Sequence, residues 1–236
     1  MYRLIVSDYD GTLNINEKPL SNQFFIKLNN LSNRGSIFAL ASGRPYNQLK
    51  KLFFKVSNSI VFVADDGAQV MYKNCLLYKK TLQMNDAKAL CGFAIENGFT
   101  AICALREENR SVKKEQLSLP FFLSADIFKI IIIKDGKNAQ AIKEFASELN
   151  VRVCYEDETY LEFCHKDANK GEAVKKLMEK FNISQMQTVI FGDGINDILM
   201  LKLTKNRFFP PNAHKEVFDV GGTVINDVEK YIIGLN

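Results

Sequence analysis

The chain opens with residues 1–20, MYRLIVSDYDGTLNINEKPL, in which an apolar run at 4–6 leads directly into two aspartates, Asp8 and Asp10. The run is typical of a buried β-strand. A buried strand gains nothing from two like charges at its end, because in a partly dry site charges about 4 Å apart repel each other by roughly 4 kcal/mol. The stretch therefore predicts that a positive group from outside the chain lies beside these carboxylates.

Strand and helix patterns alternate from this first strand through residue 81. The expected elements are, in chain order, strand 3–7, a helix with its N-cap at Ser21, strand 36–41, a helix from Pro45, strand 60–64 and a hairpin of strands 68–72 and 76–80. Strands that alternate with helices form a parallel sheet covered on both faces. We therefore predict an α/β core of the Rossmann-like, doubly wound type.

The middle of the chain has a different pattern. Its expected elements are helix 85–97, strand 100–105, a charged irregular stretch to residue 119, strand 127–133, helix 139–149 and strands 152–155 and 160–164. This order is typical of an α+β unit with an antiparallel sheet. Parallel-type alternation then resumes with helix 169–181, strand 187–191 and helix 195–203. We predict a discontinuous core domain of residues 1–81 and 166–236, with residues 82–165 inserted as an α+β cap domain.

Composition excludes several classes of protein. The 236 residues are 47% hydrophobic and 25% charged, which is ordinary globular usage. No apolar stretch approaches the ~20 residues of a membrane helix, and the chain begins with a strand pattern instead of a signal peptide, so we expect a cytoplasmic protein. The net charge of +4 is small and spread out, which argues against a nucleic-acid partner. Five cysteines without a CxxC pair favour neither disulfides nor a zinc site.

Polar residues are concentrated just after the apolar runs, where an open α/β sheet binds its ligands. Four places carry them: Asp8, Asp10 and Thr12; Ser42-Gly43-Arg44; Lys170-Gly171 ahead of a helix; and residues 192–197, GDGIND. Each has an ordinary structural explanation when taken alone, such as a turn, a cap or a surface charge. Four such places at the same end of successive core elements are hard to explain by turns. Side-chain alternation places Asp8 and Asp10 on one side of an extended chain, and a helical segment places Asp193 and Asp197 on one face. We therefore expect all four carboxylates to converge on one point.

Converging carboxylates without a nearby histidine or thiol suit a hard cation, and Mg²⁺ binds one or two carboxylates together with waters and a substrate phosphate. The missing positive group is then a metal ion. Lys170 and the Ser42 hydroxyl offer a cation and a donor to phosphate oxygens, and backbone N–H groups around Gly11 and Gly43 add further donors.

These motifs resemble those of the haloacid dehalogenase superfamily of phosphohydrolases, in its Cof-like branch with a type IIB cap. The resemblance rests on DYDGTL at 8–13, ASGR at 41–44, Lys170-Gly171 and GDGIND at 192–197 followed by Met200-Leu201, and it spans nearly the whole chain. It implies a Mg²⁺-dependent phosphatase that acts on a small phosphorylated metabolite. A sugar phosphate is our own expectation for the substrate. The inserted domain would be a lid that excludes water and contacts the leaving group.

The resemblance also implies roles for individual residues. Asp8 would be the nucleophile that forms an aspartyl-phosphate, and Asp10 would be the general acid and then the base. The metal would be held by Asp8, the backbone carbonyl of Asp10 and Asp193, with Asp197 as a further ligand or support. Lys170 would stabilise the transferring phosphoryl group, and the phosphate-binding residues would be Ser42, Gly43, Arg44 and Asn196.

Two departures from the family pattern limit what similarity transfers. Where the family has Asn-Gly-Ala, this chain has Asp65-Asp66-Gly67-Ala68, which leaves the role of Asp66 open. The inserted domain is also short for the branch, so the substrate does not follow from similarity. Arg106 and Arg110 lie in a charged segment typical of a surface, although both are candidates for anion contacts. For Arg44, pairing with a core carboxylate is the alternative to binding phosphate.

Two other functions stay open at this point. A phosphosugar mutase of the same superfamily shares the first motif and a similar cap, but it requires a sugar bisphosphate for turnover. A non-catalytic phospho-receiver module also gathers carboxylates around Mg²⁺ at this strand end, although Lys170 and the large insertion argue against it. The sequence indicates no oligomeric state.

Overall fold

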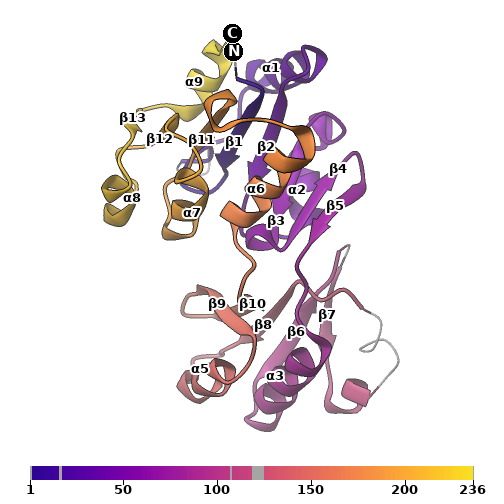
Figure 1. Ribbon diagram of the computed structural model, residues 1–236. Coiled ribbons are helices and arrows are strands. Elements are labelled where there is room, and N and C mark those ends of the chain that lie inside the picture. Colours follow the sequence, from indigo (N-terminus) through magenta and orange to yellow (C-terminus); the bar gives the residue numbers. More distant parts are fainter. Residues whose placement is uncertain (1, 16–17, 107, 119–124, 236) are drawn as a thin grey trace. The chain divides into compact units, whose positions relative to one another are not determined.

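A computed structural model describes residues 2–15, 18–106, 108–118 and 125–235 (Figure 1). The chain forms two compact units: a core unit of Met1–Tyr78 with Asn169–Asn236, and an inserted unit, Lys79–Ala168. The chain leaves the core unit once and returns once. The junctions lie three residues from the domain boundaries that the sequence predicts, at 81/82 and 165/166.

The core unit is built on an eight-stranded sheet in the order β13-β12-β11-β1-β2-β3-β4-β5. The bounds of its strands are β1 Leu4–Asp8, β2 Ile37–Ala41, β3 Val61–Ala64, β4 Gln69–Tyr72, β5 Cys75–Lys79, β11 Thr188–Phe191, β12 Arg207–Phe209 and β13 Thr223–Val224. Neighbouring strands from β13 to β3 are parallel, and β4 is antiparallel to β3. The predicted parallel α/β core is confirmed.

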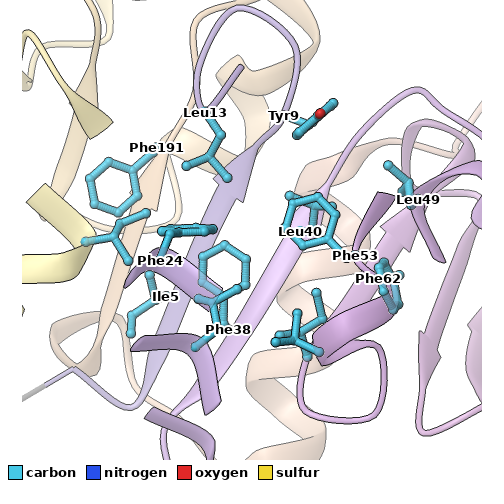
Figure 2. Close-up of a cluster of buried hydrophobic side chains, with 14 of the residues drawn as sticks. Ile5, Tyr9, Leu13, Phe24, Phe38, Leu40, Leu49, Phe53, Phe62 and Phe191 are labelled. Atoms are coloured by element: carbon cyan, nitrogen blue, oxygen red, sulfur yellow. The ribbon is translucent and has the colours of Figure 1, made fainter. Parts of the chain in front are cut away.

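Helices cover the sheet, and the side chains of β1 alternate between two apolar clusters, as the pleat of a strand requires. The helices of the core unit are α1 Asn22–Asn33, α2 Tyr46–Leu52, α6 Lys170–Phe181, α7 Ile198–Leu201, α8 Lys215–Asp219 and α9 Val228–Gly234. Ile5 packs with Phe24 of α1 in one cluster, which Figure 2 shows, whereas Leu4 and Val6 pack with Val174 of α6 in the other. The sheet is therefore buried on both faces.

Helix α1 starts where the sequence predicts. The hydroxyl of Ser21 accepts a hydrogen bond from the backbone N–H of Phe24, which satisfies one of the unpaired donors of the first turn. Apolar residues at helical spacing then face the sheet, and three of them are buried: Phe24, Leu28 and Leu31. Cap and periodicity thus agree on the same boundary.

Replacing Phe24 by Ala is expected to lower the free energy of unfolding by about 3–5 kcal/mol, because the change leaves a cavity in the core. The Phe24 ring is fully buried and lies edge-on to Phe38, with 5.9 Å between the ring centroids. Urea unfolding measures the loss. The control is Ile26→Ala on the same helix. The Ile26 side chain is 60% exposed, so this variant should lose no more than about 0.5 kcal/mol of the free energy of unfolding. Equal losses in the two variants would contradict this account of the core.

The inserted unit contains a five-stranded sheet in the order β7-β6-β8-β10-β9, with antiparallel pairing throughout. Its elements are α3 Met84–Glu96, β6 Thr100–Ala104, β7 Asn109–Val112, β8 Lys129–Ile133, α5 Gln140–Ser147, β9 Val151–Glu156, β10 Tyr160–His165 and the 3₁₀ turn η3 Lys114–Ser118. Residues of α3 and α5 share one apolar cluster with alternate residues of the strands. The predicted antiparallel α+β unit is confirmed.

Three local predictions were wrong or missing. Residues 109–112 lie in the stretch expected to be irregular, yet they form β7 at the sheet edge, because pairing with β6 orders a segment whose exposed residues give no apolar period. Residue 119, where that stretch ends, lies outside the described residues.

The predicted helix 195–203 is a 3₁₀ turn, η5 Ile195–Asp197, followed by the short α7. Beyond Leu203 the sequence predicted no element, and the structure adds β12, α8, β13 and α9. Within the described residues, no helix has both the length and the apolar character to cross a membrane.

Candidate active site

The candidate site lies at the carboxyl end of the parallel strands of the core unit. Asp8 is the last residue of β1, Ser42 follows β2, and Asp193 comes two residues after β11. Parallel strands end at the same edge of a sheet, so these side chains emerge together. Asp8 alternates with Leu4 and Val6 and therefore faces α6, whose first residue is Lys170.

Three carboxylates meet at this edge. One oxygen from each of Asp8, Asp193 and Asp197 lies within 4.8 Å of the other two, and the side chains of Asp8 and Asp197 are buried. The donor atoms are all carboxylate oxygens, which is the ligand type that Mg²⁺ prefers. These residues therefore fit a divalent cation.

Lys170 is the ammonium of this cluster and is almost completely buried. Its Nζ donates to Oδ1 of Asp8 at 2.6 Å and to Oδ1 of Asp197 at 2.7 Å. Burial opposes the charged form, but the neighbouring carboxylates of Asp197, Asp8 and Asp66 outweigh burial and raise the pKa of Lys170, which keeps the lysine charged. Conversely, burial raises the pKa of Asp8 more than the attraction of Lys170 lowers it. One ammonium thus does not balance the acidic cluster.

The glycine-containing loop after β1 holds Asp193 in place. Gly11 has φ +84°, and a Cβ at this position would lie 2.2 Å from Oδ2 of Asp193, so the close approach needs glycine. The hydroxyl of Thr12 donates a hydrogen bond to Oδ1 of Asp193. The sequence placed Thr12 near the site but assigned it no role, and the structure makes it a support for the metal-binding candidate.

Asp197 has two partners at once. Its Oδ1 accepts from Lys170, while Oδ2 accepts the backbone N–H groups of Asp193, at 3.0 Å, and Gly194, at 2.9 Å. The turn therefore closes around this carboxylate, which explains why the segment begins as a 3₁₀ turn instead of the predicted α-helix.

The carboxylate of Asp10 does not join this cluster, so three of the four predicted carboxylates converge. It is bound instead by Arg44, with Nε 2.8 Å from Oδ2 and Nη2 2.7 Å from Oδ1. The chain is no longer extended at this point: the N–H of Asn14 donates to the carbonyl of Tyr9, and Asp10 forms an isolated bridge with Asn14. The alternation on which the prediction rested therefore ends at Asp8, and the Asp10 carboxylate forms an ion pair instead of joining the cluster. Metal binding by the backbone carbonyl of Asp10 stays a prediction.

The predicted phosphate-binding residues lie at two neighbouring strand ends. Ser42 is buried, and its hydroxyl accepts the backbone N–H of Arg44 at 3.1 Å. No heavy atom would lie within 4 Å of a Cβ at Gly43. Asn196 is exposed and donates from Nδ2 to Oδ1 of Asp66 at 3.0 Å. Their predicted contacts with phosphate stay predictions, as does a phosphate contact by Arg44, whose guanidinium is engaged by Asp10.

Asp66, whose role the sequence left open, lies at the junction of three motifs. The turn η2, Asp65–Gly67, has positive φ angles at all three of its residues. The backbone N–H of Asp66 donates to the carbonyl of Ser42 at 3.1 Å, and its side chain accepts from Asn196. A Cβ at Gly67 would lie 2.2 Å from the carbonyl oxygen of Asn169, next to Lys170. Asp66 thus links the second and fourth motifs, and Gly67 of the same turn packs against the start of the third.

Metal-free protein is expected to lose stability through the acidic cluster as the pH rises. Burial raises the pKa of Asp193 above its ordinary value, so the folded chain binds more protons than the unfolded chain once the pH exceeds about 3.9. This contribution is fully present below that pH and is lost as the pH rises through the folded-state pKa. Asn at position 193 has no carboxyl group to titrate. In EDTA, the melting temperature of Asp193→Asn minus that of the wild type should therefore increase as the pH rises from 4 to 7.

Magnesium provides the control for this experiment. Because a ligand that binds the folded state stabilises it, Mg²⁺ at pH 7 should raise the melting temperature of the wild type more than that of Asp193→Asn. A melting-temperature difference between the two proteins that does not change with pH or with Mg²⁺ would contradict the electrostatic account.

Comparisons with known proteins agree with the fold that carries this site. The family model described as haloacid dehalogenase-like hydrolase matches residues 5–231. The 5-amino-6-(5-phospho-D-ribitylamino)uracil phosphatase of Escherichia coli is 23% identical over 256 residues, covering 99% of this chain and 91% of its own. A crystal structure from Thermotoga maritima superposes with a TM-score of 0.85 at 23% identity and covers 100% of this chain and 98% of its own. The HAD subclass IIB sugar phosphatase BT4131 superposes with a TM-score of 0.71 at 19% identity, covering 97% and 95%.

Proposed function

Because the chain belongs to the family of haloacid dehalogenase-like hydrolases, we propose that it is a Mg²⁺-dependent phosphatase that hydrolyses a small phosphorylated metabolite through an aspartyl-phosphate. The single observation that carries the proposal is the cluster of Asp8, Asp193 and Asp197 around Lys170 at the carboxyl end of the sheet. Its donors suit a hard divalent cation and its buried ammonium suits a phosphoryl group.

In the proposed reaction, an oxygen of Asp8 attacks phosphorus and the bond to the leaving oxygen breaks. Asp10 gives its proton to that oxygen and later takes a proton from the water that cleaves the aspartyl-phosphate. Lys170 offsets part of the negative charge beside Asp8 throughout, while Ser42, Gly43 and Asn196 bind the phosphoryl oxygens. Phosphoryl transfer is catalysed mostly by positioning of the reacting groups and by electrostatic stabilisation. These residues therefore supply the main contributions to catalysis.

The metal site of the proposal consists of Asp8, Asp193 and the backbone carbonyl of Asp10, with Asp197 as a further ligand or a support. When bound, Mg²⁺ would neutralise charge on the phosphoryl oxygens and orient them. The contacts of Asp197 with Lys170 and with two backbone N–H groups favour the supporting role.

A sugar phosphate is the proposed substrate class, supported by the likeness of the fold to a subclass IIB sugar phosphatase. A lid role for the inserted unit and a cytoplasmic location remain predictions. Steady turnover of p-nitrophenyl phosphate with Mg²⁺, lost on adding EDTA, tests the reaction. A screen of phosphorylated metabolites ranked by kcat/KM then tests the substrate class. Turnover that requires a catalytic amount of sugar bisphosphate would overturn hydrolysis in favour of a mutase, and no turnover in either assay would overturn catalysis.

Asp193→Asn is expected to raise the Mg²⁺ concentration for half-maximal turnover by about 10-fold or more, on the scale of effects seen when metal sites lose supporting groups. A magnesium titration of turnover measures it. Glu179→Gln, an exposed acid at the far end of α6, serves as the control and should leave the titration unchanged. Identical titrations of wild type and Asp193→Asn would count against Asp193 as a ligand.

A further inference from the structure

We propose that Arg44 is a positioning residue that acts through Asp10: its guanidinium holds the carboxylate of Asp10 in the orientation for proton transfer to the leaving oxygen. The inference rests on the proposed phosphatase function. It concerns a residue that the sequence offered either as a phosphate contact or as the partner of a carboxylate, and it assigns that residue an action on the general acid.

The first observation is the two-pronged ion pair. Nε and Nη2 of Arg44 each contact a different oxygen of Asp10, at 2.8 and 2.7 Å. A planar guanidinium paired with a planar carboxylate in this way sets direction as well as distance, because rotation of either group breaks one of the two bonds. The side chains of Arg44 and Asp10 are 39% and 48% exposed, so the pair lies at the mouth of the site.

The second observation is that Arg44 is itself fixed from three sides. Its guanidinium lies over the ring of Tyr9, with 5.3 Å between Cζ and the ring centroid. The Tyr9 ring is buried and packs edge-on against Phe53, with 5.7 Å between centroids. The backbone of Arg44 donates to the hydroxyl of Ser42 and accepts from the N–H of Asp65 at 3.0 Å. An unbroken series of packed groups thus leads from the apolar core to the carboxylate of Asp10.

The third observation is the separation of the Asp10 carboxylate from the acidic cluster. Its carboxylate is outside the group formed by Asp8, Asp193 and Asp197. In-line transfer forms the bond from Asp8 to phosphorus on one side and breaks the bond to the leaving oxygen on the opposite side. The proton must therefore be delivered away from the nucleophile, and the separation of the Asp10 carboxylate from the acidic cluster is consistent with that requirement. In the second step the proton returns from water to Asp10 as phosphate leaves Asp8, so protons balance over the cycle.

Two substrates that differ in their need for a proton separate positioning from phosphate binding. The departing group of p-nitrophenyl phosphate leaves readily as an anion, whereas that of phenyl phosphate benefits more from protonation. Arg44→Gln should lower kcat/KM for phenyl phosphate about 10–100-fold, less than the roughly 10²–10⁴-fold of a whole general acid because Asp10 itself remains, and for p-nitrophenyl phosphate by no more than about 3-fold. Arg44→Lys should not restore activity, because an ammonium does not reproduce the two-pronged contact.

A double-mutant cycle gives the decisive measurement. Asp10→Asn should show the same preference for the better leaving group, and adding Arg44→Gln to it should change kcat/KM for phenyl phosphate by less than about 3-fold, because the two residues act as one unit. The melting temperature should fall by less than about 4 °C in Arg44→Gln, since exposed ion pairs contribute little to stability. Arg34→Gln, an exposed arginine that caps the end of α1 away from the site, should match the wild type.

The outcomes separate this inference from the proposed function. Equal losses with both substrates, or a full further loss when Arg44→Gln is added to Asp10→Asn, would show that Arg44 contacts the phosphoryl group directly and would overturn the inference while leaving the phosphatase in place. Higher activity in Arg44→Gln would also overturn it. A wild type without Mg²⁺-dependent turnover would overturn the phosphatase proposal and this inference with it.

Discussion

Asp8→Asn is expected to lower kcat by at least about 10⁴-fold, because an amide oxygen is a poor nucleophile and loss of a nucleophile removes the covalent route. The substitution keeps the size and shape of the side chain at the end of β1. It also removes a carboxylate whose pKa burial raises, so the metal-free protein should unfold at the same temperature or higher. Function is lost in this variant while the fold is retained.

The measurement combines steady-state turnover with trapping of the phosphorylated enzyme by acid quench. Wild type should carry a covalent phosphoryl group during turnover, and Asp8→Asn should carry none. Glu179→Gln should behave as the wild type in both assays. Retention of more than about 1% of the wild-type kcat in Asp8→Asn would refute the assignment of Asp8 as nucleophile.

Lys170→Met is expected to lower the free energy of unfolding in EDTA by about 3–5 kcal/mol, the range found when one partner of a buried ion pair is removed. Lys170 is 1% exposed and has two carboxylate partners, both buried, which would be left facing each other. Methionine retains most of the volume of the side chain, so the loss reports charge more than packing. Turnover should fall with it, because the transferring phosphoryl group loses its ammonium.

Urea unfolding with and without Mg²⁺ distinguishes electrostatics from packing. Mg²⁺ should recover part of the stability lost in Lys170→Met, and combining Lys170→Met with Asp197→Asn should do so without metal. Lys176→Met is the matched control on the same helix. The Lys176 side chain is 43% exposed and also has acidic partners, so this variant should lose no more than about 1 kcal/mol of the free energy of unfolding. A Lys170→Met protein as stable as this control would contradict a charge-balancing role.

The core and the positions of its polar residues could be predicted because local and global signals agree there. The run at 4–6 is buried on both faces, and alternation carries Asp8 toward α6. The positions of Asp193 and Asp197 follow from the strand before them, since parallel strands deliver their carboxyl ends to one edge. Family resemblance and strand-end chemistry therefore point to the same edge of the sheet.

The predictions that failed depend on tertiary contacts. The orientation of Asp10 is decided by a turn with Asn14 and by Arg44, which comes 34 residues later in the chain. Strand β7 exists because β6 pairs with it, and its own residues carry no period. The position of Asp66 requires a left-handed backbone and a partner 130 residues away. The consecutive Asp-Asp-Gly after a strand was the available signal, since Asp and Gly tolerate this conformation better than other residues.

The unusual backbone of η2 has a consequence for laboratory evolution. Asp65 and Asp66 have φ angles of 51° and 57°, a conformation that glycine adopts at lower cost. A library selected for heat resistance in chelating buffer should therefore enrich glycine at these two positions and asparagine in the acidic cluster. The selected variants would be more thermostable but catalytically inactive. A selection for thermostable, active variants must therefore also select for turnover.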